Sequence, residues 1–181
     1  MSHVVRRKLG YDDLAGMPDD GLIREILDGE LVVTPSPAPV HQRVSKRLQR
    51  QLEAYFEARR LGEVFNAPLD TILGPHDIVE PDLLVVTDPA AISNRAIERP
   101  PALVVEILSP STAGLDRNQK RRRYAASGVA HYWLVDIENR HVACLRLAGD
   151  QYEVAAEGRG TDPLTHPDWP GLTIDLAELW R

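Results

Sequence analysis

One stretch of the chain restricts the fold more than any other. Residues 102–109 are almost entirely apolar, and a single acid, Glu106, interrupts them. A strand of this kind is expected to be buried on both faces, so other structure must cover the sheet on each side. The sequence therefore favours a layered α/β (α+β) fold, in which helices flank a mixed β-sheet.

The segments around this strand agree with a layered fold. Apolar residues follow the 3.6-residue period of a helix over residues 40–60, and residues 115–127 form a second predicted helix. The Asp28-Gly29 pair between apolar segments predicts an N-terminal β-hairpin over residues 23–33. Further strands are expected at residues 63–73, 81–86, 131–135, 141–147 and 152–155. Because the chain shows no repeat and no linker, residues 1–181 are predicted to form a single domain.

Composition excludes several classes of protein. The only cysteine is Cys144, which rules out a disulfide framework and a cysteine-based zinc site. No apolar segment is long enough to span a bilayer, and the N-terminus lacks a signal-peptide core, so we expect a soluble, cytoplasmic protein with no membrane partner. The net charge of −6 argues against tight nonspecific binding to nucleic acid but permits a local basic surface.

Two acids lie in unusual places. Glu106 is costly in a buried strand unless it is protonated, hydrogen-bonded or bound to a cation; the simpler explanation is a strand end or an ion pair with an arginine. Asp82 begins an apolar strand after Pro81, where it could simply be a turn residue. If the two strands are neighbours, however, both carboxylates can reach one ion, and carboxylates are the usual protein ligands of Mg²⁺.

A lysine in the second predicted helix is the third candidate. Asp116, Lys120 and Tyr124 are spaced by four residues and so share one helix face. From spacing alone, a surface pair of Asp116 with Lys120 is the simpler explanation. A role at a phosphate requires that this helix pack beside Asp82 and Glu106.

Several strings of residues together resemble a known family. They are EILDGELV at 25–32, PDL at 81–83, VEILSPST at 105–112 and YWLVD at 132–136, with Asp116, Lys120 and Tyr124 between the last two. This ordered set is similar to the Uma-type restriction endonucleases of the PD-(D/E)XK nuclease superfamily, and the resemblance covers residues 11–180. It implies a restriction-endonuclease-like core of a helix, a three-strand meander, a helix and a strand.

The resemblance also implies a divalent-metal nuclease site. Asp82 matches the first acid of the motif and Glu106 matches the second. The superfamily usually has a lysine two residues after the second acid, but this chain has Leu108 there. The resemblance to the Uma-type subgroup implies that Lys120, from the following helix, replaces it. Glu30, from the hairpin, would add a further metal ligand.

The function that this resemblance implies is Mg²⁺- or Mn²⁺-dependent hydrolysis of phosphodiester bonds, by a DNA endonuclease. Basic residues expected to contact the DNA backbone are Arg43, Lys46, Arg47, Arg50 and Arg121. A homodimer is expected because proteins of this fold often dimerise. Two alternatives stay open: a catalytically inactive nuclease fold that serves as a binding or assembly module, and a metal-dependent hydrolase of a small phosphate ester.

Overall fold

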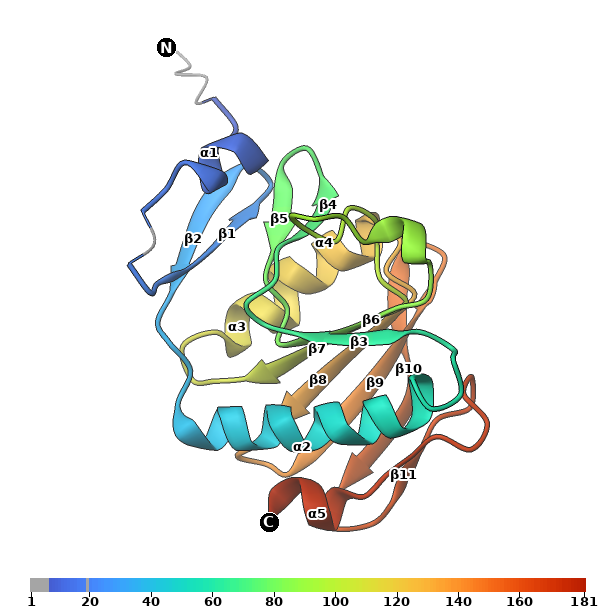
Figure 1. The fold of residues 1–181 in the computed structure, drawn as a ribbon. Helices are drawn as coiled ribbons and strands as arrows, with labels where there is room; N and C mark the ends of the chain where they lie inside the picture. The colour runs from blue at the N-terminus through green and yellow to red at the C-terminus, as the bar shows by residue number, and fades with distance from the viewer. Residues whose placement is uncertain (1–6, 19) are drawn as a thin grey trace.

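A six-stranded mixed sheet forms the centre of the protein (Figure 1). The computed structural model describes residues 7–18 and 20–181, and the strand order of this sheet is β10-β9-β8-β7-β6-β3. The strands are β3 (Glu63–Asn66), β6 (Leu83–Val86), β7 (Leu103–Leu108), β8 (His131–Asp136), β9 (His141–Ala148) and β10 (Gln151–Arg159). β7 and β8 pair in parallel and the other neighbours pair antiparallel, which confirms the predicted mixed sheet.

The apolar strand β7 is buried on both faces, as its sequence predicts. Leu103 lies in a core cluster with the long helix α2 (Pro39–Phe56), whereas Val104 lies in a second cluster with α4 (Arg121–Ala126). Successive side chains of a strand point to opposite faces of the sheet. Glu106 therefore points to the face that α4 covers, and this is the face from which Lys120 can reach it.

A smaller antiparallel sheet carries the N-terminal hairpin. Its strand order is β2-β1-β5-β4, with β1 (Ile23–Leu27), β2 (Glu30–Thr34), β4 (Thr71–Gly74) and β5 (Asp77–Val79). Asp28 and Gly29 connect β1 to β2, with φ angles of 53° and 81°. Positive φ at both positions is what a tight hairpin turn requires, and Asp-Gly adopts it readily. The predicted N-terminal hairpin is confirmed.

The predicted strand over residues 63–73 is wrong as a single element. Its first part, β3, pairs with β6 in the large sheet, and its last part, β4, pairs with β5 in the small sheet. Pro68 lies between them and has no backbone N–H to donate, so the strand cannot continue through it. β5 itself was not predicted, because it is only three residues long.

The helix that follows β7 has an unusual start. The segment α3 (Ala113–Leu115) leads into η2 (Asp116–Lys120), which is a π-helix, and then into α4. This crossover joins the parallel strands β7 and β8. The wider turn of the π-helical segment carries Asp116 and Lys120, and both side chains are buried. Such segments often mark functional sites.

The C-terminal segment packs on the face that α2 covers. It comprises β11 (Leu164–Thr165), β12 (Thr173–Ile174) and α5 (Leu176–Trp180), and α5 lies beside α2 (Figure 1). Two short helices, α1 (Tyr11–Ala15) and η1 (Pro89–Ala91), complete the described elements. Among the described residues, no helix has both the length and the apolar character to cross a membrane.

Candidate active site

Acidic side chains gather in a pocket where the hairpin, α2, β7 and the π-helical segment meet. Its volume is about 230 Å³, which is room for several water molecules. We call it the acid pocket; its charged lining residues are Glu25, Glu80, Asp82, Glu106, Asp116 and Lys120. The structure thus brings Asp82, Glu106 and Lys120 together, although they come from three separate elements.

Lys120 faces the acids and not the solvent. Its side chain is 6% exposed, and Nζ lies 2.8 Å from Glu25 Oε1 and 3.0 Å from Glu106 Oε1. Asp116 Oδ1 is farther away, at 3.8 Å. The alternative of a surface ion pair with Asp116 is therefore wrong, because the π-helical segment directs the lysine into the molecule. Burial acts to lower the pKa of Lys120, but the three carboxylates outweigh it and raise that pKa.

Glu106 is held from two sides. Besides the ammonium of Lys120, the hydroxyl of Tyr124 donates a hydrogen bond of 2.6 Å to the same oxygen, Oε1. Burial raises the pKa of Glu106 well above its usual value, although the charge of Lys120 opposes the rise. Lys120 and Tyr124, which are four residues apart in the sequence, thus contact Glu106 from one helix face.

Asp82 lies immediately before β6 and is fixed by the backbone of the neighbouring strand. The N–H of Ile107 donates to Asp82 Oδ2 at 2.7 Å. His41, near the start of α2, places Nε2 at 3.2 Å from that oxygen and at 3.0 Å from the carbonyl oxygen of Ile107. His41 is buried and lines the pocket, although nothing in the local sequence marks it as a site residue.

The pocket contains more acids than its one lysine can neutralise. Burial raises the pKa of Asp116 to about 6. Burial also raises the pKa of Glu80 to about 7, with smaller contributions from the charges of Asp70 and Glu25. Carboxyl groups with raised pKa values favour either protons or a bound cation in their surroundings.

The hairpin contributes Glu25 to the pocket, and the structure does not bring Glu30 there. Glu30 is exposed and lines a separate hollow with Lys8 and Asp28. Glu25 is 2% exposed. The signal for Glu25 is the same one that marked Glu106, an acid next to buried apolar residues of a strand.

The basic residues predicted to bind DNA do not line the acid pocket. Arg43, Lys46 and Arg50 are exposed on α2. Arg47, on the same helix, donates to the backbone carbonyl groups of Leu179 and Arg181. The remaining predicted residue is Arg121, which donates to the carbonyl oxygen of Tyr152 at 2.8 Å and lines a hollow beside β10.

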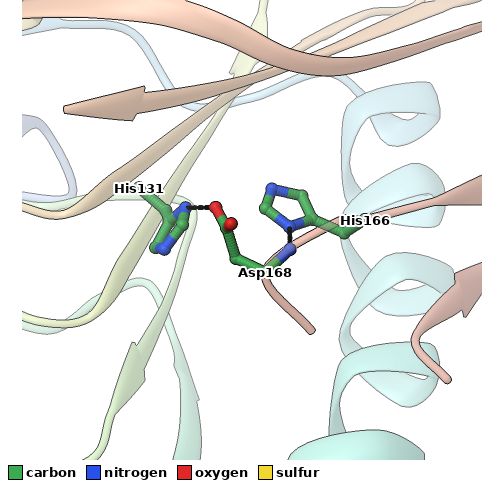
Figure 2. Close-up of side chains that lie close together, drawn as sticks. All are labelled: His131, His166 and Asp168. Carbon is green, nitrogen blue, oxygen red and sulfur yellow. Dashed lines mark hydrogen bonds and ion pairs between the residues drawn. The ribbon is translucent and has the colours of Figure 1, made fainter. Parts of the chain in front are cut away.

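A second group of ligand-type side chains lies elsewhere in the fold. His131, His166 and Asp168 each bring one ligand atom within 4.8 Å of the others, which is close enough to consider a metal ion (Figure 2). His131 begins β8, and the other two residues follow β11. We call this group the histidine cluster.

The mixed sheet, with helices on both faces and acids at one strand end, is the architecture of the restriction-endonuclease-like nucleases. A family model described as "Uma2: Putative restriction endonuclease" matches residues 11–177. The chain therefore belongs to the Uma2 family, as the resemblance predicted, and this membership indicates a nuclease.

Comparison with solved structures agrees on the fold. A crystal structure described as a "putative nuclease" from Anabaena variabilis ATCC 29413 matches with a TM-score of 0.77 and 18% sequence identity. The match covers 95% of this chain and 97% of the other, and at this identity it shows the fold alone. No match was found among curated proteins.

Proposed function

We propose that this protein is a metal-dependent endonuclease that hydrolyses phosphodiester bonds of DNA in the acid pocket. Asp82 and Glu106 would hold Mg²⁺ or Mn²⁺, and Lys120 would act on the phosphate. The observation that carries the proposal is the contact of 3.0 Å between Lys120 and Glu106 inside a pocket that Asp82 also lines. Family membership supports the reaction class.

The acid pocket suits a hard divalent cation. Among the described residues, the hydrogen bonds of Glu106 go to Oε1 and those of Asp82 go to Oδ2, which leaves the second oxygen of each carboxylate for an ion. Within the same described part of the chain, Asp116 Oδ1 is buried without a hydrogen-bond partner. Mg²⁺ prefers such oxygen ligands. A bound cation would neutralise phosphate charge and make water a better nucleophile.

Lys120 would stabilise the charge that develops on the phosphate. An ammonium group has three N–H donors. Glu25 and Glu106 engage two of them, and the third remains for a phosphate oxygen or an attacking water. A fixed positive group in a pocket shielded from water stabilises such charge more strongly than it would in bulk water.

Binding of the DNA backbone is assigned to the exposed basic residues of α2. This helix begins beside the acid pocket, where His41 lies, and Arg43, Lys46 and Arg50 are exposed along it. Lysine and arginine bind phosphates by releasing counterions from the nucleic acid. Because the protein as a whole is negative, binding is expected to be local and to weaken steeply with salt.

The first test is cleavage of plasmid DNA by the Glu106→Gln variant in Mg²⁺ or Mn²⁺. Glutamine keeps the shape of the side chain and its contact with Tyr124, so the variant is expected to fold. Cleavage should fall by about 100-fold or more because the metal loses a charged ligand. The matched control is Glu63→Gln, an exposed glutamate of the same sheet. Unchanged cleavage by folded Glu106→Gln would overturn the site assignment.

The second test separates Lys120 from the metal ligands. Lys120→Ala should slow cleavage severely and leave the affinity for Mn²⁺ nearly intact, because lysine is not a ligand. Lys120→Arg keeps the positive charge but should restore little activity, since a planar guanidinium cannot replace a compact ammonium. Circular dichroism checks that each variant is folded. Full activity of Lys120→Ala would discard its role.

A second candidate function is an inactive nuclease fold that binds a partner without cleaving it. Two observations favour it: Leu108 stands where the superfamily lysine usually lies, and Lys120 is already engaged by carboxylates. Calorimetric titration with Mn²⁺ distinguishes the two functions when it is run beside the cleavage assay. Tight Mn²⁺ binding without cleavage of any DNA would favour the inactive module.

We also propose that the chain is one domain and that it forms a homodimer. Contacts between the two sheets support a single domain, since Leu27 and Val79 of the small sheet share a core cluster with Val104 of the large one. Light scattering during gel filtration tests the dimer. Thermal unfolding in one transition, followed at two wavelengths, tests the single domain.

A further inference from the structure

The N-terminal hairpin lies outside the large sheet, yet it sends one charged side chain into the acid pocket. β1 pairs only with β2 and β5 among the described strands. Glu25 of β1 is 2% exposed, and the next residues, Ile26 and Leu27, are fully buried. Burying a carboxylate among such residues is costly unless it is paired. Its partner therefore indicates what the side chain does there.

Glu25 is held rigidly and in turn holds Lys120. Its Oε1 accepts the backbone N–H of Glu80 at 2.9 Å, directly after β5, the strand that pairs with β1. The same oxygen lies 2.8 Å from Lys120 Nζ. The carboxylate is thus fixed by the backbone of the small sheet, and it fixes the end of a long, flexible side chain.

We propose that Glu25 is the positioning residue of Lys120, an inference that rests on the proposed nuclease function. In the usual motif the lysine stands on the same strand as the second acid, so the strand itself orients it. Here the lysine comes from a helix, and its four-carbon stem has many conformations. Glu25 takes the orienting role that the strand has in the usual motif, because it holds the ammonium at one place in the pocket.

Distances show why Glu25 is needed beside Glu106. A cation held by Glu106 would repel the ammonium of Lys120 and so would weaken the Lys120–Glu106 pair. Of the remaining carboxylates in contact with Nζ, Glu25 lies at 2.8 Å and Asp116 at 3.8 Å. Coulombic attraction falls with distance, so the shorter contact, that with Glu25, holds the ammonium more strongly. Glu25 is the group able to keep Lys120 in place.

The test measures kcat, KM and Mn²⁺ affinity for Glu25→Gln with the full chain and plasmid DNA. We expect kcat to fall by about 10- to 100-fold, the effect of a misplaced catalytic group, while KM and Mn²⁺ affinity change less than twofold. The control is Glu63→Gln, an exposed glutamate of β3, which should equal the wild type.

A double variant distinguishes positioning from general stabilisation. If Glu25 acts through Lys120, adding Glu25→Gln to Lys120→Ala should slow cleavage no further than Lys120→Ala alone. A structural role would lower kcat in both backgrounds. Should Glu25→Gln fail to fold, Glu25→Asp keeps the charge but shortens the side chain, and kcat should still fall.

Three outcomes would overturn the inference. A folded Glu25→Gln or Glu25→Asp variant with the kcat of the wild type removes the positioning role. A loss of Mn²⁺ affinity in Glu25→Gln makes Glu25 a metal ligand. Additive losses in the double variant make its role structural. Wild-type protein that cleaves no DNA with either metal instead refutes the proposed function itself, and this inference with it.

Discussion

The acid pocket and the histidine cluster both gather side chains that bind metals in proteins, but their charges balance differently. In the acid pocket, carboxylates outnumber the single ammonium of Lys120. In the histidine cluster, the one carboxylate, Asp168, already has a cationic partner, since Arg146 Nη1 donates to its Oδ1 at 2.9 Å. An excess of negative charge attracts a divalent cation, and the histidine cluster lacks it.

Hydrogen-bond directions separate the two groups further. His166 Nδ1 accepts the backbone N–H of Asp168 at 3.2 Å (Figure 2), so in the neutral ring the proton lies on Nε2. A metal needs a lone pair at that atom. Trp169 also packs with its ring centroid 4.2 Å from that of His131 and 4.4 Å from that of His166, which limits rearrangement.

The comparison shows that residue types and proximity alone do not define a metal site. Ligand atoms around a tetrahedral Zn²⁺ lie about 3.3 Å apart, given bonds of about 2.0 Å, whereas His131 Nδ1 and Asp168 Oδ2 of the histidine cluster are 3.9 Å apart. The acid pocket keeps carboxylate oxygens available, while in the histidine cluster Asp168 pairs with Arg146, His166 Nδ1 accepts a backbone N–H, and Trp169 packs against both imidazole rings.

The largest expected effect concerns the buried charge of the acid pocket. Lys120→Met should lower the free energy of unfolding at pH 7 by about 3–5 kcal/mol, because it leaves buried carboxylates without a counter-charge. Urea denaturation measures it, with Lys46→Met on the exposed face of α2 as the control. A loss below about 1 kcal/mol would mean that these acids are neutral in the folded protein.

The next prediction concerns metal binding, and its outcome can reverse the conclusion that the acid pocket suits a metal ion better than the histidine cluster does. Glu106→Gln should weaken Mn²⁺ binding by about tenfold or more, whereas His166→Gln should leave it unchanged. Isothermal titration calorimetry on both variants measures the difference. If His166→Gln abolished binding and Glu106→Gln did not, the histidine cluster would be the metal site of this protein.

The pH dependence of stability should have opposite signs in the two regions. The pKa of Glu80 is raised from 4.5 to about 7 by burial, so its folded state keeps a proton that the unfolded chain releases. The stability that the folded protein has with Glu80 protonated is therefore fully present below pH 4.5, and it is lost as the pH rises to about 7. Compared with Glu80→Gln, the metal-free wild type should lose stability over that range, and a flat difference would contradict this.

In the histidine cluster, by contrast, the stability should fall as the pH is lowered. Burial lowers the pKa of His166 from 6.5 to about 4, so the folded protein resists a proton that the unfolded chain accepts. The wild type should lose stability, compared with His166→Gln, as the pH falls from about 6.5 to about 4. Thermal denaturation at several pH values measures this, with His141→Gln as the control. A difference independent of pH would place the imidazole in solvent.

Much of the fold follows from local signals in the sequence. The Asp28-Gly29 turn needs positive φ at two neighbouring residues, and its type can therefore be predicted without tertiary information. The apolar run around Glu106 requires cover on both faces, and the helix-spaced Asp116, Lys120 and Tyr124 share a face wherever the helix packs. Each of these inferences concerns residues close together in the chain.

The tertiary structure alone decided which distant side chains meet. Glu25 and Glu30 both belong to the hairpin, and only the pairing of β1 with β5 directs Glu25 to Lys120. Strand pairing likewise split residues 63–73 between two sheets at Pro68. The physical reason is that hydrophobic periodicity and turn chemistry act over a few neighbouring residues. The acid pocket is instead assembled by burial and by pairing between distant segments. Glu25 and Lys120, which are in contact there, are 95 residues apart in the chain (120 − 25).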